Sequence, residues 1–141
     1  MVVVMNLNRS ELRKKIMTIL YQVNVYETNN VEYTIDDVIK QLVPIDNEFV
    51  KEIVYGVVTY KNELRDIANK YLNGWTIDRL GNTDQAILLM ALYELKYAKT
   101  PPIVVINEAL NLADIYSDIK VKNMINAVLD KFYHNEVLNE G

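Results

Sequence analysis

Hydrophobic residues recur every three or four positions along most of the chain, which is the spacing of one face of an α-helix. In the first such segment Leu12, Ile16, Ile19 and Val23 share this spacing, and they predict a helix from about residue 9 to residue 26. Further segments predict helices over about 34–42, 46–58, 64–72, 83–98, 103–116 and 118–132. The expected fold is therefore all-α, with about seven helices.

Residues that begin helices stand between these segments. Thr34, Asp46 and Asp118 each precede a hydrophobic run, and each is expected to accept a hydrogen bond from the first turn of the helix that follows. Asn82 or Thr83 is expected to do the same for the segment 83–98. That segment is hydrophobic around much of its circumference, so its helix is expected at the centre of a bundle.

Length and composition favour one domain over residues 1–141. A chain of 141 residues has the size of a single domain, and four Gly and three Pro residues are too few for a disordered chain. Residues 1–8 and 135–141 are expected to be flexible ends. Val2 to Val4 and Ile103 to Ile106 are β-branched runs in which a strand competes with a helix.

Basic residues are concentrated near both ends of an acidic chain. The net charge is −4, but residues 9–15 carry a local charge of +3 and residues 120–131 one of +2, so the rest must sum to −9. If the fold brings the two basic segments together, they form one anion-binding face. The alternative is that both are ordinary solvent-exposed helix surfaces.

The residue types of common catalytic centres are scarce in this sequence. It has no cysteine, a single histidine near the C-terminus, and four glycines too dispersed for a phosphate-binding loop. We therefore expect no enzymatic activity, no cofactor and no metal. The longest apolar run, Ala86 to Tyr93, is eight residues and too short to span a membrane, and the lack of cysteine is compatible with the cytoplasm.

Two carboxylates, Glu94 and Glu108, interrupt apolar stretches of the sequence. A carboxylate near a core is costly unless it is hydrogen-bonded. We expect both to accept hydrogen bonds from helix N-terminal amides or tyrosine hydroxyls and so to fix the register of helices. A catalytic role is the alternative.

Several motifs occur in a fixed order along the chain. They are Arg9-x-x-x-Arg13 before Ile19-Leu-Tyr21, Val54-x-Gly56-Val, Trp75-Thr-Ile-x-Arg79-Leu, Ala91-Leu-Tyr-Glu-Leu95, Ile106-Asn-Glu-Ala109 and Ile125-Asn-x-Val-Leu-Asp130. In this order and spacing, over about residues 9–131, the chain resembles the NusB family of bacterial transcription antitermination factors. The resemblance implies an all-helical fold of two small helical bundles.

The resemblance also implies a function. NusB-like proteins pair with the ribosomal protein NusE, and the heterodimer binds the boxA element of nascent RNA. Together with RNA polymerase, NusA and NusG, it supports transcription of ribosomal RNA operons. The chain is accordingly expected to be a cytoplasmic RNA-binding factor. Some family members self-associate through the RNA-binding face, so a homodimer stays open.

The RNA-binding residues of the family correspond to two segments of this chain. In the first, Arg9, Arg13 and Lys14 would hold phosphates. The second contributes Lys120, Lys122, Asn123, Met124 and Asn126. The family commonly has Ser at Val121, Phe at Met124 and Gly at Ala127. Since Met lacks the aromatic face on which a base stacks, weaker or altered RNA binding is expected.

The NusE-facing residues of the family correspond to Tyr21 and Asp84. Asp84 is explained equally well by its place in the first turn of a helix, where a carboxylate complements the helix dipole. Two alternative functions stay open. NusB-like domains also occur at the N-terminus of ribosomal RNA cytosine methyltransferases, and a helical protein-interaction domain without RNA binding would fit the departures at Val121, Met124 and Ala127.

Overall fold

The computed structural model describes residues 7–138, which form seven α-helices and two short helical turns. They are α1 (Arg9–Thr28), α2 (Ile35–Leu42), α3 (Glu48–Thr59), α4 (Lys61–Tyr71), η1 (Ile77–Arg79), α5 (Asn82–Tyr97), α6 (Pro102–Tyr116), α7 (Ile119–Phe132) and η2 (Tyr133–Val137). The expected all-α fold is confirmed. The run Ile103 to Ile106 lies in α6, and Val2 to Val4 lies outside the described residues.

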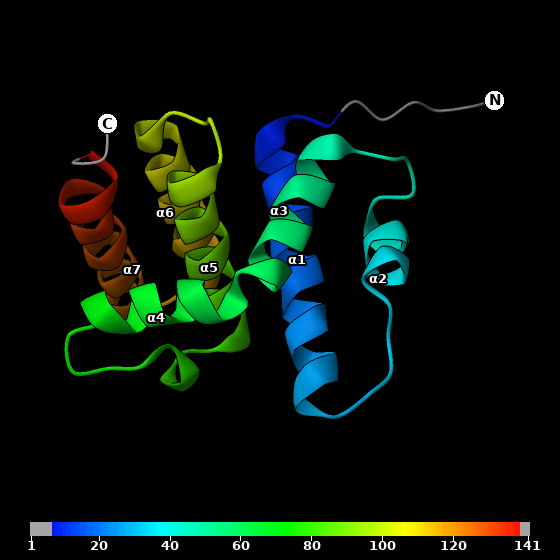
Figure 1. The fold of residues 1–141 in the computed structure, drawn as a ribbon, viewed down its shortest axis with the longest axis horizontal. Helices are drawn as coiled ribbons and strands as arrows, with labels where there is room; N and C mark the ends of the chain where they lie inside the picture. The colour runs from blue at the N-terminus through cyan, green and yellow to red at the C-terminus, as the bar shows by residue number, and fades with distance from the viewer. Residues whose placement is uncertain (1–6, 139–141) are drawn as a thin grey trace.

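The helices form two groups that share α5. Figure 1 shows α1, α2 and α3 on one side and α4, α6 and α7 on the other. Helix α5 lies between them and packs against α1, α3, α4, α6 and α7. Every residue from Gln85 to Leu95 is buried, so the prediction that this helix occupies the centre is confirmed.

Two of the predicted helix caps are confirmed and one is wrong by a single residue. The Thr34 hydroxyl caps α2 and the Asp118 carboxylate caps α7, each accepting a hydrogen bond from the first turn of its helix. Helix α3 is capped by Asn47, whose side chain accepts from the Val50 amide at 3.0 Å. Asp46, the predicted cap, instead forms an ion pair with Lys51.

The start of α5 also differs from the prediction. The residue before the helix is Gly81, and no side chain caps it. Neither predicted cap, Asn82 or Thr83, is at the cap position, because both already lie in the first turn of the helix. The Asn82 side-chain oxygen instead accepts a hydrogen bond from Asn24 of α1 at 2.7 Å. This bond ties α1 to the start of α5.

The C-terminal segment is held against the rest of the molecule as far as η2. In η2, Glu136 accepts a hydrogen bond from Tyr71 and lies 3.3 Å from the Lys70 ammonium. Of the ends expected to be flexible, residues 1–6 and 139–141 lie outside the described residues. No helix in the described part of the chain is long and apolar enough to cross a membrane.

Candidate nucleic-acid interface

The first basic segment forms the N-terminal turns of α1. Asn8 caps the helix by accepting a hydrogen bond from the Glu11 amide at 2.9 Å. Arg9 is exposed, and its guanidinium carbon lies 4.4 Å from the centre of the Phe49 ring. Lys14 is exposed as well. Within the described residues neither cation is paired with a carboxylate, so both remain available to an anion.

Arg13 does not belong to this exposed set, which corrects the sequence-based prediction. Only 3% of its side chain is accessible, and its Nε and Nη2 donate hydrogen bonds of 3.0 and 2.7 Å to the two carboxylate oxygens of Glu94. The charge is neutralised by Glu94 and shielded from solvent. Arg13 cannot hold an RNA phosphate without breaking this ion pair.

The structural role predicted for Glu94 and Glu108 is supported, but the predicted partners are wrong. Glu94 accepts from Arg13 and, at 3.3 Å, from the Thr100 hydroxyl. Glu108 accepts from the Ser10 hydroxyl at 2.8 Å. Among the described residues neither carboxylate accepts a hydrogen bond from a helix amide or a tyrosine hydroxyl. The Ser10 contact places the start of α1 beside the middle of α6.

The second basic segment, residues 120–131, forms nearly all of α7, and its predicted RNA-binding residues lie in the first half of that helix. Lys120 is exposed, and its ammonium lies 4.9 Å from the centre of the Trp75 ring. Lys122 forms an ion pair with Asp114 of α6, so its charge is largely compensated. Asn123 and Asn126 are exposed on the helix surface, whereas Met124 is half-buried against the core.

Two residues of the connector before α5 join this second segment. Arg79 is exposed, and its guanidinium carbon lies 4.2 Å from the centre of the Trp75 ring that Lys120 also contacts. The sequence singled out Trp75 and Arg79 only as part of a family motif. No local pattern indicates that they meet Lys120, because the contact joins residues 45 positions apart and depends on how α6 and α7 fold back.

The two basic segments do not form a single face, which corrects the expectation that they converge. In Figure 1 the start of α1 lies at the top, whereas α7 begins lower down, at the level of α4. Helix α6 contacts both: Ser10 bonds to Glu108, and α6 packs against α7. From Glu108 to the end of α6 at Tyr116 is about 12 Å by helical rise. The basic segments are therefore two patches connected by α6.

The residues predicted to face NusE lie along the edge between α1 and α5. Tyr21 is exposed on α1, one helical turn before Asn24, which bonds to Asn82. Asp84 lies in the first turn of α5 and accepts a hydrogen bond from the Ser117 hydroxyl. Asp84 thus fastens the end of α6 to α5, and that contact adds a third explanation for its presence.

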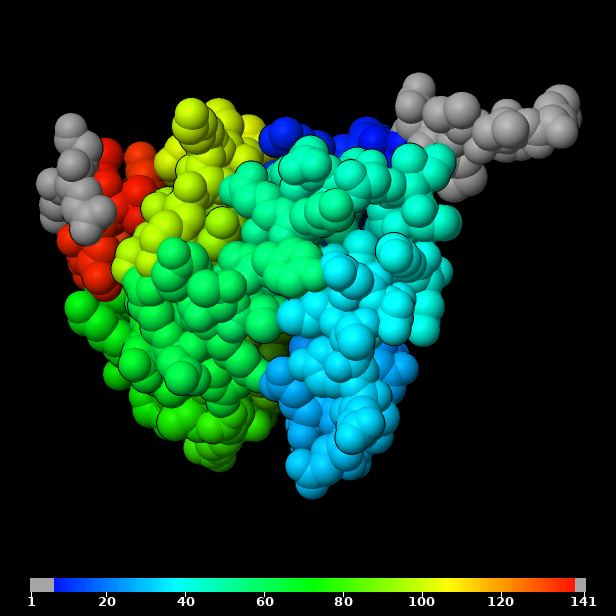
Figure 2. Space-filling model, turned by 45° about the vertical axis from the view of Figure 1, so that its right-hand side comes forward, coloured from blue at the N-terminus to red at the C-terminus, as the bar shows by residue number. Residues whose placement is uncertain are grey.

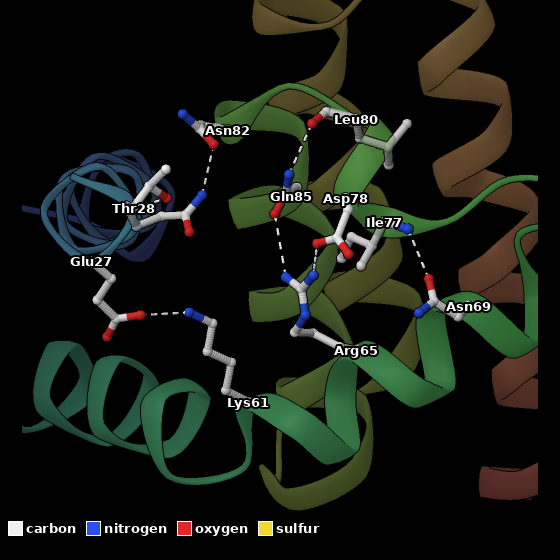
Figure 3. A network of polar contacts seen from close by, with 11 residues as sticks. Glu27, Thr28, Lys61, Arg65, Asn69, Ile77, Asp78, Leu80, Asn82 and Gln85 are labelled. Carbon is white, nitrogen blue, oxygen red and sulfur yellow. Dashed lines mark hydrogen bonds and ion pairs between the residues drawn. The ribbon is translucent and has the colours of Figure 1, made fainter. Parts of the chain in front are cut away.

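Beside this edge is a notch between α1 and the helices α4 and α5, visible in Figure 2 between the blue and the green parts of the surface. Figure 3 shows its polar contacts: Lys61 bonds to Glu27, and Arg65 reaches Asp78 and Gln85.

The enclosed volume of this notch is about 30 Å³. It has room for water but is far smaller than a typical small-molecule pocket. Nor do the described residues contain a cluster of acidic or histidine side chains suited to a metal ion.

The chain is similar to known proteins in sequence and in fold. The sequence model of the NusB family matches residues 10–134. The transcription antitermination protein NusB of Macrococcus caseolyticus is 34% identical over 132 residues, which cover 92% of this chain and 99% of that protein. NusB of Halalkalibacterium halodurans is 39% identical over 126 residues, covering 89% and 92%. A crystal structure of the antitermination factors NusB and NusE in complex with double-stranded RNA superimposes with a TM-score of 0.74 at 25% identity and covers 89% of this chain and 96% of that one.

Proposed function

The chain belongs to the NusB family, and from this premise we propose that it is a non-enzymatic, RNA-binding transcription antitermination factor. It pairs with the ribosomal protein NusE and binds boxA RNA of ribosomal RNA operons, in a complex with RNA polymerase, NusA and NusG. Such a factor acts in the bacterial cytoplasm. The relatives named as antitermination proteins are matched over more than nine tenths of their length, which favours this function over that of a methyltransferase domain.

The RNA-binding part of the proposal is based on a set of exposed cations without carboxylate partners among the described residues, in an otherwise acidic chain. Arg9 and Lys14 on α1 and Lys120 on α7 are exposed and lack an ion pair among the described residues, although the net charge is −4. Cations kept free of carboxylates in an acidic protein favour an anionic partner.

The separation of the two patches determines how RNA is bound. A single compact anion cannot reach both, but an extended single strand can lie along α6 and place successive phosphates at the start of α1 and at the start of α7. Single-stranded RNA is usually bound along such tracks, over roughly 4–16 nucleotides in comparable proteins. We propose this extended track in place of one shared cradle.

The NusE contact is proposed at the edge that bears Tyr21 and Asp84. Tyr21 is 40% exposed and offers a hydroxyl and a ring to a partner. Asp84 engages the partner in addition to Ser117 or in exchange for it. Tyr21→Ala is expected to lower NusE affinity without lowering the free energy of unfolding, because the side chain is not part of the core.

The test combines the full chain with NusE and a boxA RNA and measures binding against salt concentration. We expect NusE to associate and to raise RNA affinity, and Arg9→Gln/Lys14→Gln to reduce the slope of log K against log salt by about 1.4, at ~0.7 per lost contact with single-stranded RNA. Lys40→Gln, at an exposed lysine of α2, is the matched control and should leave the slope unchanged.

The possible outcomes separate the functions considered. If NusE does not associate and RNA binds without sequence preference, the proposal fails. NusE binding without any RNA binding would instead identify a protein-interaction domain. Sedimentation with and without RNA tests for a homodimer, which RNA should dissociate if the copies associate through the RNA-binding face.

A further inference from the structure

Trp75, Arg79 and Lys120 form a cluster that the sequence did not predict, which we call the indole site. The indole is half-buried against the core, and the two exposed cations approach it to 4.2 and 4.9 Å from its centre. By the sum of these distances, the Arg79 guanidinium carbon and the Lys120 ammonium lie no more than 9.1 Å apart. Two separate elements, the connector and the start of α7, therefore present positive charge at one place.

The acidic residues nearest in sequence do not neutralise these cations. Asp78, next to Arg79, forms an ion pair with Arg65 of α4. Asp118, two residues before Lys120, accepts a hydrogen bond from the Val121 amide at 2.8 Å. Among the described residues Arg79 and Lys120 have no carboxylate partner of their own. The indole attracts both cations through its π face but supplies no counter-charge.

We propose that the indole site binds phosphate groups of single-stranded RNA and that it extends the RNA track beyond α7 onto the connector. Arg79 offers a planar fork of donors to phosphate oxygens, and Lys120 offers a point charge beside it. The indole holds the two side chains in place by cation–π contacts, so less side-chain entropy is lost when RNA binds. This inference rests on the RNA-binding function proposed above.

The chain contains one tryptophan, so the emission of Trp75 reports directly on this site. The experiment titrates a boxA RNA into the full chain already bound to NusE and follows both tryptophan fluorescence and RNA anisotropy. We expect RNA to change the Trp75 emission. In Arg79→Gln/Lys120→Gln the change should be lost and the salt slope should fall by about 1.4, corresponding to two phosphate contacts.

Two further variants serve as controls. Lys131→Gln removes an exposed lysine from the other end of α7 that has no ion pair among the residues described, and it should leave both signals unchanged. Arg79→Lys keeps the charge, and it should retain the salt slope.

Each outcome decides a different question. If RNA binds the double variant with unchanged slope and the wild-type emission does not respond, the indole site is not used, while the proposed function stands. If NusE alone changes the emission and the double variant loses NusE affinity, the site binds protein and the inference is overturned. If no RNA binds to the wild-type complex, the proposed function fails and the inference falls with it.

Discussion

Arg13 of α1 and Glu94 of the shared central helix α5 form a two-bond ion pair, with 3% and 2% of their side chains accessible. The pair explains two features of the sequence at once: a basic residue on an otherwise apolar face of α1, and a carboxylate within the most hydrophobic helix. Bidentate geometry fixes the relative register of α1 and α5.

Replacing Arg13 with Met should strongly destabilise the protein. The substitution leaves the Glu94 carboxylate buried, with the Thr100 hydroxyl as its one remaining hydrogen-bond donor among the described residues. Removing one member of a buried ion pair typically costs about 3–5 kcal/mol. Urea unfolding followed by circular dichroism measures this loss.

Two variants show whether the cost comes from the orphaned carboxylate. Arg13→Met/Glu94→Leu replaces both charges with apolar groups and should recover much of the lost stability. Lys14→Met, at the exposed neighbour, should change the free energy of unfolding by less than about 0.5 kcal/mol. If Arg13→Met instead unfolds like the wild type and loses RNA affinity, Arg13 is an RNA contact after all.

The fold was predictable because its signals are local. Helical periodicity and capping residues act over three or four positions, so the seven helices and the caps Thr34 and Asp118 could be read from the sequence. The cap of α3 was assigned one residue too early because Asp46 and Asn47 are both suitable cap residues. Only the structure shows that Lys51 holds Asp46.

The candidate interface was less predictable because its geometry depends on tertiary contacts. Arg13 and Lys14 are adjacent and equally basic in the sequence, yet one is buried against Glu94 and the other is exposed. Charge patterning also contains no information on which ends of two helices meet. The prediction that the basic segments converge was wrong for that reason. The contact between Lys120 and Trp75 was missed for the same reason.

Gly56→Ala is expected to destabilise the protein although alanine favours helices. A methyl group at Gly56 of α3 would clash with ring carbons of Tyr93 in α5. The Tyr93 ring is itself held between Tyr60 and Tyr97, with ring centres 6.5 and 5.4 Å away, so it cannot easily move. We expect a loss of roughly 1–3 kcal/mol from overpacking, against a gain of about 1 kcal/mol in helix propensity.

Thermal or urea unfolding of Gly56→Ala, Tyr93→Leu and the double variant tests this explanation. Once the ring is removed, the alanine no longer clashes with it. The double variant should therefore lose less unfolding free energy than the sum of the losses in the two single variants. Strict additivity would show that the close approach of α3 and α5 at Gly56 is not responsible.

The contacts of Glu27 with α4 and with the segment before α2 predict a pH dependence. Hydrogen bonds from Lys61 at 2.7 Å and from Tyr33 at 2.6 Å lower the pKa of Glu27 below its ordinary value of 4.5. A carboxyl with a lowered pKa in the folded state stabilises the protein above its unfolded pKa. That contribution is lost as the pH falls through the folded pKa.

Glu27→Gln should therefore be less stable than the wild type at pH 7, and the difference should shrink as the pH falls below about 4.5, the ordinary pKa of the carboxyl. Urea midpoints at several pH values measure this difference, with Glu32→Gln at an exposed neighbour as the control.

At the alkaline end, burial and the bond to Glu27 raise the pKa of Tyr33 to about 12. Its contribution is complete below its unfolded pKa of 10.0 and is lost as the pH rises toward 12.

Met124→Phe is expected to strengthen RNA binding. Met124 is half-buried near the start of α7, at the position that the resemblance to the NusB family matches with a Phe. An aromatic ring there offers a stacking surface worth about 1–3 kcal/mol per base, so RNA affinity should rise roughly tenfold. Fluorescence anisotropy with a boxA RNA in the presence of NusE measures the change. Met124→Leu adds no aromatic face and should bind RNA like the wild type, so an equal gain in both variants would show that hydrophobic packing, and not stacking, sets the affinity.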